Sequence, residues 1–304
     1  MNNLSDSNPS RTEARGAPAL LFEMMRSFVM LAKTLNLSQA VEELGSTRQT
    51  VRRHVSQLEE AMGCKLFDVK DRRYSLTAKG ADAVGPAQLL LDQGNVWYQG
   101  QVTYQGGMPQ YKIDFPGGGN FYQQQKPLGL IWTDDRPLLS AVLRAWTLSK
   151  GALEDPHFDV VRRYVMVFRN SPNGWVCTEL GDDSSYVTWF GLANARSSIG
   201  RVLGELPGGP EFGRLLSEPF KEVEADGGLR LDHISTQIPR TAGGFPEQIC
   251  YARLLLGARF PDGSFALVSV VDRHNNIQIT GAPDMPMAPE LVMALDAELL
   301  NQKY

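Results

Sequence analysis

The polar side chains that follow residue 47 have the types and spacing needed to read the edges of DNA bases. Arginine and glutamine are the long side chains best suited to paired hydrogen bonds with bases in the major groove. Several of them fall close together, namely Arg48, Gln49, Arg52 and Arg53, with Ser56 following. The chemistry that this set indicates is recognition of duplex DNA.

The surrounding residues predict a helix-turn-helix that would hold these side chains. Apolar residues recur at steps of four, three and four, which is the spacing of one face of an amphipathic helix. They are Val51, Val55, Leu58 and Met62. Upstream, Gly45 ends a shorter helix, and Ser46 or Thr47 can accept a hydrogen bond from the exposed amides of the next one. The predicted motif spans residues 38–60.

The flanking segments complete a compact domain. Apolar residues between positions 21 and 35 keep helical spacing and predict a preceding helix. Two short apolar runs, Lys65–Val69 and Tyr74–Leu76, predict a hairpin wing around a basic turn. The tip residues Lys70, Arg72 and Arg73 would lie over a phosphate strand, which fixes position rather than sequence.

A further helix is predicted from Thr77, which can cap it, to about Gln93. Gly85 and Pro86 predict a break or a bend within it. Its apolar residues share one face suited to a second copy, and they are Ala83, Val84, Ala87, Leu90 and Leu91. Because specific sites normally need two reading heads about one helical turn of DNA apart, we expect a homodimer through this helix, which could pair into tetramers.

The run from Phe28 to Gly80 resembles the winged helix-turn-helix of LysR-type transcriptional regulators. Four motifs follow in the family's order, and they are Gln57-Leu58-Glu59-Glu60, Gly63-Cys64-Lys65-Leu66-Phe67, Asp71-Arg72-Arg73 and Leu76-Thr77-Ala78-Lys79-Gly80. The resemblance covers about the first third of the chain. It implies major-groove contacts from Thr47, Arg48, Gln49, Arg52 and Arg53, and it implies that Ser38 caps the scaffold helix beside a phosphate.

This chain departs from the family at two of the implied contacts. The family usually has proline where Gln49 stands and a small residue where Arg52 stands, so the base preference of relatives does not transfer. Other charges in the region have simpler interpretations. Four glutamates are expected to be surface charges, namely Glu42, Glu43, Glu59 and Glu60. His54 is expected either to contact a phosphate or to sit at the edge of the helix.

Length and composition indicate two domains and no membrane span. The chain has 304 residues, of which 42% are hydrophobic, and no apolar run approaches the roughly 20 residues that cross a bilayer. Three separated cysteines match no disulfide or zinc pattern and fit a reducing cytoplasm. Residues 20–80 contain ten Lys/Arg and seven Asp/Glu, whereas residues 81–304 contain eighteen and twenty-five. A basic DNA reader is therefore joined to an acidic remainder.

Composition also suggests where the parts begin and end. Residues 1–18 are expected to be disordered, 19–80 to form the DNA-binding domain and 81–94 the linker helix. The segment 95–130 is rich in glycine, glutamine and aromatic residues, which predicts a mobile connector with short strands at Val102–Tyr104 and Tyr111–Phe115. Residues 131–280 are expected to form a second domain and 281–304 a tail with a helix.

The sequence of the second domain predicts a definite order of helices and strands. A helix is predicted over 138–150, then two strands joined at Asn173-Gly174, then helices over 184–205 and 211–225. Three strands follow at 229–238, 248–260 and 264–272. This order resembles a PAS sensor domain, which gives an α+β fold class with an antiparallel sheet and helices on one face. The alternative is the periplasmic-binding-like effector domain of most LysR members, in which a terminal hairpin is hard to place.

A PAS-like domain would place a ligand cavity between its sheet and the central helices. The candidate contacts are aromatic or able to orient a ligand, and they are Trp175, Tyr186, Trp189, Arg196, His233, Tyr251 and Arg253. Ordinary core packing is the competing interpretation for most of them. No cofactor or metal is predicted, since no flanking pattern supports haem ligation by His157 or His233.

Two classes of function fit these observations. In the first, the protein is a cytoplasmic transcriptional regulator that binds double-stranded DNA. Its C-terminal domain would sense a small, partly apolar effector and alter the geometry of a homodimer, or would only dimerise. In the second class, an enzyme or scaffold carries a fused DNA-binding domain. Because residues 130–280 contain no clustered nucleophile or acid/base motif, we predict no enzymatic activity.

Overall fold

The computed structural model describes residues 17–70, 73–115, 119–133, 136–172, 174–207, 209–240 and 244–295. Contacts divide the chain into two compact units, Met1–Gln93 and Gly94–Tyr304. The disorder predicted for residues 1–18 lies almost wholly outside the described residues. So does most of the helix predicted for the tail.

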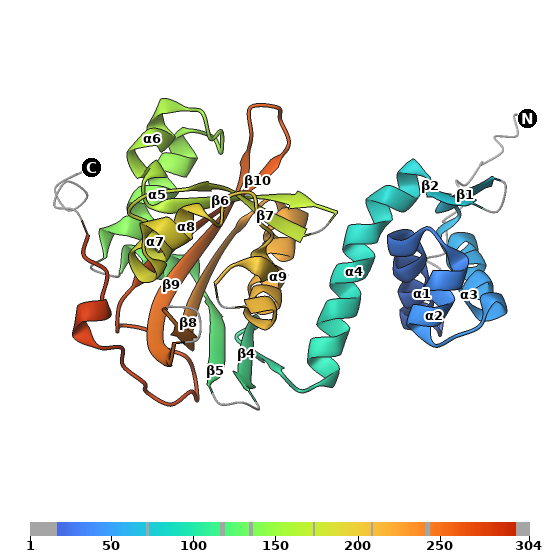
Figure 1. Ribbon diagram of the computed structural model, residues 1–304, viewed down its shortest axis with the longest axis horizontal. Coiled ribbons are helices and arrows are strands. Elements are labelled where there is room, and N and C mark those ends of the chain that lie inside the picture. The colour runs from blue at the N-terminus through green and yellow to red at the C-terminus, as the bar shows by residue number, and fades with distance from the viewer. Residues whose placement is uncertain are drawn as a thin grey trace, which may run out of the picture. The chain divides into compact units, whose positions relative to one another are not determined.

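A helix-turn-helix with a hairpin wing forms the N-terminal unit (Figure 1). Its elements are α1 (Leu21–Thr34), α2 (Leu37–Leu44), α3 (Arg48–Met62), β1 (Phe67–Lys70), β2 (Arg73–Leu76) and the start of α4 (Ala78–Tyr98). The helices pack around a core whose most buried side chains include Phe28, Leu31, Val51 and Leu66. The predicted motif and wing are confirmed.

The turn between α2 and α3 explains where each helix begins. Gly45 takes a left-handed φ of 56° and ends α2, and the Thr47 hydroxyl accepts from the Thr50 amide at 3.1 Å. The cap predicted for Ser38 is wrong. The cap lies two residues earlier at Asn36, whose Oδ1 accepts from the Ser38 amide at 2.9 Å.

The burial expected of Met62 and the end expected for α4 are wrong, and α4 has no break near Gly85 and Pro86, where a bend stays a prediction. Met62 is 49% exposed, because it is the last residue of α3 and lies beyond the part of the helix that packs. The α4 helix continues through Pro86 and past Gln93 as far as Tyr98. The predicted cap at its start is present, since the Thr77 hydroxyl accepts from the Gly80 amide at 2.9 Å.

An eight-stranded antiparallel sheet forms the centre of the C-terminal unit in the described part of the chain (Figure 1). Its strand order is β3-β4-β5-β8-β9-β10-β6-β7. The strands are β3 (Val102–Gln105), β4 (Met108–Asp114), β5 (Asn120–Lys126), β6 (Val165–Ser171), β7 (Gly174–Leu180), β8 (Leu229–Pro239), β9 (Pro246–Arg259) and β10 (Phe265–Arg273). Antiparallel pairing throughout contradicts the parallel plan of alternating strands and helices, so the periplasmic-binding-like alternative is wrong.

Most of the described part of the segment 95–130 belongs to this sheet rather than to a mobile connector. It supplies β3, β4 and β5, and β5 pairs with β8 in a register that sets Gln124 opposite His233. Three of the glutamines that suggested a loose linker, Gln110, Gln123 and Gln124, are buried and hydrogen-bonded. The Gln123 amide, 1% exposed, donates to Asp232 at 3.2 Å. A strand of this composition is stabilised by partners more than a hundred residues away.

Helices cover both faces of the sheet, so the prediction of helices on one face is wrong. The helices are α5 (Pro137–Leu148), α6 (Pro156–Arg162), α7 (Ser185–Phe190), α8 (Leu192–Arg196) and α9 (Gly209–Asp226). Side chains alternate along β9: Leu254 and Leu256 belong to the core with α5 and α6, whereas Leu255 packs with Phe220 of α9. The almost uninterrupted burial along β9 reflects this double cover.

The central helical region is more broken than predicted. Residues 184–205 form α7, α8 and a short 3-10 turn at Leu203–Glu205 instead of one helix. Gly191 separates α7 from α8 with a φ of 81°, a backbone conformation that favours glycine. Residues of α7 and Leu203 of the 3-10 turn line a cavity on this face of the sheet.

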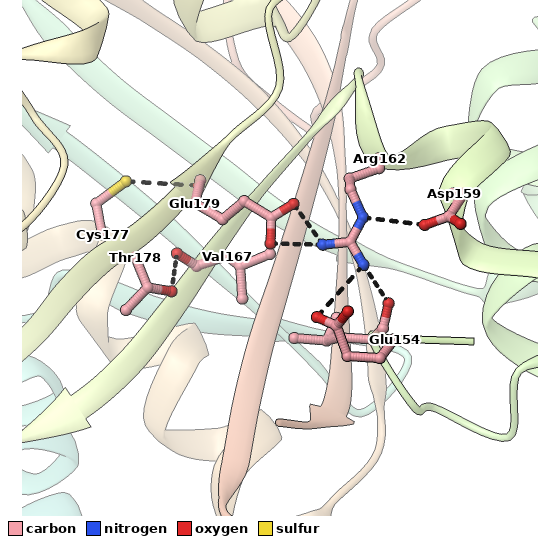
Figure 2. Close-up of polar contacts among 8 residues, drawn as sticks. Glu154, Asp159, Arg162, Val167, Cys177, Thr178 and Glu179 are labelled. Atoms are coloured by element: carbon pink, nitrogen blue, oxygen red, sulfur yellow. Dashed lines mark hydrogen bonds and ion pairs between the residues drawn. The ribbon is translucent and has the colours of Figure 1, made fainter. Parts of the chain in front are cut away.

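Arg162 fastens α6 to β7, a strand at the edge of the sheet (Figure 2). Its Nη1 lies 2.8 Å from both carboxylate oxygens of Glu179, and its Nε lies 3.3 Å from Asp159. The guanidinium also donates to the Leu153 carbonyl and lies 3.7 Å from Glu154. One side chain thus joins three segments of the unit.

Candidate functional site

The predicted base-reading side chains share an exposed surface at the start of α3. Thr47, Arg48, Gln49, Arg52 and Arg53 are all exposed. Arg48 donates through Nη2 to the Ser38 hydroxyl at 2.9 Å, which ties α3 to α2 across the turn. The structure therefore brings together the six residues that the sequence placed on α2 and α3.

His54 lies on the opposite side of α3. It is 7% exposed, and its Nδ1 lies 2.9 Å from the Ser27 hydroxyl on α1. Neither expectation for His54 is correct, because the ring faces the core and joins α3 to α1. Arg52 and Arg53, which directly precede His54 in the chain, are exposed on the other side of the helix.

Glu59 holds the base of the wing, although the sequence suggested a surface charge. It is 8% exposed, and its Oε1 accepts from the amides of Leu66 at 2.9 Å and Phe67 at 3.3 Å. Lys65 Nζ lies 2.6 Å from the other oxygen. Burial acts to raise the pKa of Glu59, but these positive partners outweigh it and hold the pKa below its usual value. The signal that could have found it is its place in the family-like Gln-Leu-Glu-Glu motif.

Thr77 and Gly80 fix the other side of the wing. The Thr77 hydroxyl donates to the Lys65 carbonyl at 2.7 Å while it caps α4. A Cβ on Gly80 would lie 2.0 Å from the Leu66 carbonyl oxygen, so only glycine permits this approach. The Leu-Thr-x-x-Gly motif is therefore a clamp between α4 and the wing.

The wing itself presents two described basic residues near its turn. Lys70 and Arg73 face each other in the β1–β2 register and are both exposed. Arg72, the third residue predicted at the tip, lies outside the described residues. The Glu59 and Thr77 contacts thus position cations that could lie against a phosphate backbone.

A cavity of about 100 Å³ lies in the C-terminal unit among β6, β8, β9, β10 and the helices α7 and α9. Four of the predicted ligand contacts line it, namely Tyr186, Trp189, Tyr251 and Arg253. Other lining side chains are aromatic or aliphatic, and they include Phe168, Phe212, Leu216, Phe220 and Ile249. The predicted cavity between sheet and central helices is present.

Three predicted contacts lie elsewhere. Trp175 packs against Phe220 in the core, with ring centroids 5.6 Å apart. Arg196 is exposed and lies 3.5 Å from Asp182. His233 lies on the opposite face of the sheet, in a smaller pocket beside Arg136, because its place on β8 alternates away from the cavity. Burial lowers the pKa of His233 to about 4, and the charge of Lys126 acts in the same direction.

A buried charge network underlies the cavity. Asp232 is fully buried and accepts from Arg230 Nε at 2.9 Å and from Arg253 Nη2 at 3.0 Å. Burial acts to raise the pKa of Asp232, but the two guanidiniums outweigh it and keep the carboxylate ionised. Arg230 is also bonded to Glu222 of α9. Sequence reasoning identified Arg253 but missed the partners that hold it.

The described residues contain no group of three or more His, Cys, Asp or Glu side chains arranged to hold a metal ion. Within the same residues, no helix is long and apolar enough to cross a membrane. Burial raises the pKa of the Cys177 thiol to about 11, so it is not poised as a nucleophile.

Comparisons with known proteins bear on the N-terminal unit. Residues 22–81 match the family described as "Bacterial regulatory helix-turn-helix protein, lysR family". The HTH-type transcriptional regulator CitR of Bacillus subtilis is 38% identical over 71 residues, which cover 23% of this chain and 24% of CitR. The HTH-type transcriptional regulator BbuR of Bordetella bronchiseptica is 35% identical over 71 residues, which cover 23% of this chain and 22% of BbuR.

The structural comparisons cover a similar share of the chain. The crystal structure of a CbnR_DBD–DNA complex has 23% sequence identity and a TM-score of 0.25, covering 26% of this chain and 90% of that one. This chain spans about a quarter of the length of the curated relatives it matches. The family match lies wholly within the N-terminal unit.

Proposed function

We propose that this chain, whose residues 22–81 form a LysR-family helix-turn-helix domain, is a sequence-specific transcriptional regulator of double-stranded DNA. Its C-terminal unit senses a small-molecule effector and changes the geometry of a homodimer on its operator. The observation that carries the proposal is the exposed polar surface at the start of α3, held in a domain of this family.

Base reading is assigned to the side chains that project from α3. Arg52 and Arg53 are exposed, and arginine can donate two hydrogen bonds to one guanine. Thr47, Arg48 and Gln49 extend the same surface, and Ser38 reaches a phosphate beside it. Lys70 and Arg73 of the wing, with Arg72, supply contacts to the phosphate backbone.

Dimerisation through α4 uses a different surface from the predicted one. Ala87 and Leu91 are buried against the core of their own unit and are not available to a second copy. Leu90 is 53% exposed and Trp97 is 71% exposed, and their spacing of seven places them on the same side of α4. We propose that this side pairs with its counterpart in a homodimer.

The sensing role rests on the cavity and on the resemblance to a PAS domain. The strands β6 and β7, the helices α7 to α9 and the strands β8 to β10 follow in the order that suggested this resemblance, with antiparallel pairing throughout. The three additional strands and the helices on the second face depart from it. A C-terminal unit that only dimerises is the second candidate, and the cavity favours sensing over it.

The test of DNA reading is selection of bound fragments from a random duplex pool, followed by affinity measurements at one salt concentration. Arg52→Ala and Arg53→Ala should each weaken binding to the selected DNA by about 1–3 kcal/mol. Lys70→Ala should weaken binding to DNA of any sequence by a similar factor. Arg259→Ala, an exposed arginine of the C-terminal unit, is the matched control and should bind like the parent. Unchanged binding by both α3 variants would overturn the assignment of the reading surface.

A further inference from the structure

Of the described residues that line the cavity of the C-terminal unit, one carries a charged side chain. Among its twenty described lining residues, the only ionic one is Arg253, and the rest are apolar, aromatic or hydroxyl-bearing. Arg253 is 2% exposed. A cation in an apolar enclosure sets the sign of the ligand charge that would be stabilised there.

Arg253 is only partly satisfied by its neighbours. Its Nη2 donates to Asp232 at 3.0 Å and to Gln123 Oε1 at 3.3 Å. Its Nε and Nη1 have no hydrogen-bond partner among the described residues. Asp232 cannot supply the missing acceptors, because its other oxygen already accepts from Arg230 at 2.9 Å and from Gln123 at 3.2 Å. Buried donors without acceptors are costly, so an acceptor in the cavity is favoured.

A second unpartnered donor lines the same cavity. Trp189 is 3% exposed, and its Nε1 has no hydrogen-bond partner in the part of the chain that the structure describes. The guanidinium carbons of Arg240 and Arg273 lie 5.3 and 5.6 Å from the centre of its ring. Two cations therefore lie near the tryptophan ring, at cation–π distance.

We propose that the cavity binds a small organic monocarboxylate with a compact apolar body. The carboxylate accepts hydrogen bonds from Arg253, with Trp189 Nε1 as the second available donor, and the apolar body packs against Phe168, Phe212 and Phe220. The volume of about 100 Å³ is smaller than the roughly 150 Å³ of a cavity that admits benzene, so it favours a short aliphatic chain as that body. This inference names the effector class and so rests on the sensing role proposed above.

The experiment compares acids with their uncharged amides on the full chain. Butanoate and hexanoate are titrated against butanamide and hexanamide by calorimetry and thermal shift, without DNA. Each acid should bind at least tenfold more tightly than its amide. Equal affinity for acid and amide would overturn the proposal, and so would the absence of binding by both acids at millimolar concentration.

Three variants assign the contacts. Arg253→Lys keeps the charge beside Asp232 but removes the planar guanidinium. It should lower the affinity for the acids at least tenfold and leave the affinity for the amides unchanged. Leu216→Phe fills the cavity and should abolish binding of acids and amides alike. Arg259→Lys, an exposed arginine of the same strand, is the matched control. If Arg253→Lys does not fold, Trp189→Phe is the substitute, because it keeps an aromatic ring without the indole N–H donor. It should lower the affinity for the acids severalfold. Parent-like binding of the acids by the folded variant would overturn the proposed contacts.

Parallel DNA-binding measurements separate this inference from the proposed function. If an acid binds the cavity and does not alter affinity for the selected DNA, the ligand class stands and the sensing role fails. If uncharged compounds alter DNA affinity while neither acid binds, the sensing role stands and the monocarboxylate is wrong.

Discussion

Replacing Glu59 by glutamine tests whether one buried carboxylate holds the wing on the DNA-binding unit. The side chain of Glu59 is 9% exposed and accepts two backbone hydrogen bonds at the base of the wing. Hydrogen bonds to a charged group contribute about 1.5–3 kcal/mol each, against about 0.5–1.5 kcal/mol for neutral pairs. Together, the two bonds should contribute about 2 kcal/mol less to the free energy of unfolding once the charge is removed. The Lys65 pair adds little, because the Lys65 side chain is 74% exposed.

The assay is urea unfolding of the N-terminal unit, followed by affinity measurements on selected DNA. Glu59→Gln should lower the free energy of unfolding by about 2 kcal/mol, and it should weaken binding to all sequences because the wing is less well positioned. The adjacent exposed Glu60→Gln is the matched control and should change neither quantity. Equal stability of the two variants would refute the assignment of Glu59 as the anchor.

Acid adds an independent readout for the same residue. The pKa of Glu59 in the folded chain lies below its usual value of 4.5, so its contribution is fully present above pH 4.5 and is lost as pH falls through the folded pKa. The parent should therefore lose stability in this range faster than Glu59→Gln. Parallel acid profiles for the parent and the variant would show that the carboxylate has no favourable partners in the folded state.

Three other substitutions test contacts that the fold depends on. Gly80→Ala should destabilise the N-terminal unit by about 1–3 kcal/mol in urea unfolding, because its Cβ would collide with the Leu66 carbonyl, and a parent-like midpoint would contradict that close approach. Arg162→Met should lower the unfolding free energy of the C-terminal unit by about 1–2 kcal/mol through loss of the Glu179 bonds, whereas Arg259→Met, on an exposed side chain, should have little effect. His233, whose folded pKa of about 4 lies below its usual 6.5, binds a proton more readily when unfolded, so stability should fall by up to about 3 kcal/mol between pH 6.5 and 4. His233→Gln should remove that slope, and an unchanged slope would place its origin in other groups.

Short-range chemistry was sufficient to predict the DNA-binding unit. The helical period of Val51, Val55 and Leu58, the break at Gly45 and the cap at Thr47 all act within a few residues of one another. The same holds for the hairpins of the C-terminal unit, where a turn and two apolar runs are adjacent in the chain. Such features appear in the structure close to where the sequence placed them.

Residues whose partners lie outside their own helix could not be interpreted in this way. From sequence alone, His54 resembles a surface residue and Glu59 a solvated charge. In the structure His54 contacts Ser27, and Glu59 accepts a hydrogen bond from the wing. Helical period and capping patterns predict neither contact. The structure was needed to show that both side chains are buried and bonded.

The C-terminal sheet shows the same limit on a larger scale. Its Gln-rich strand β5 has the composition of a linker, yet Gln123 is bonded to Asp232, which lies 109 residues further along. Periodicity indicated strands β8 to β10, but the helices on both faces and the unpartnered N–H groups of Arg253 depend on which distant segments pack together. Burial and hydrogen bonding across such separations are properties of the assembled unit, because each group is desolvated only when its partners arrive.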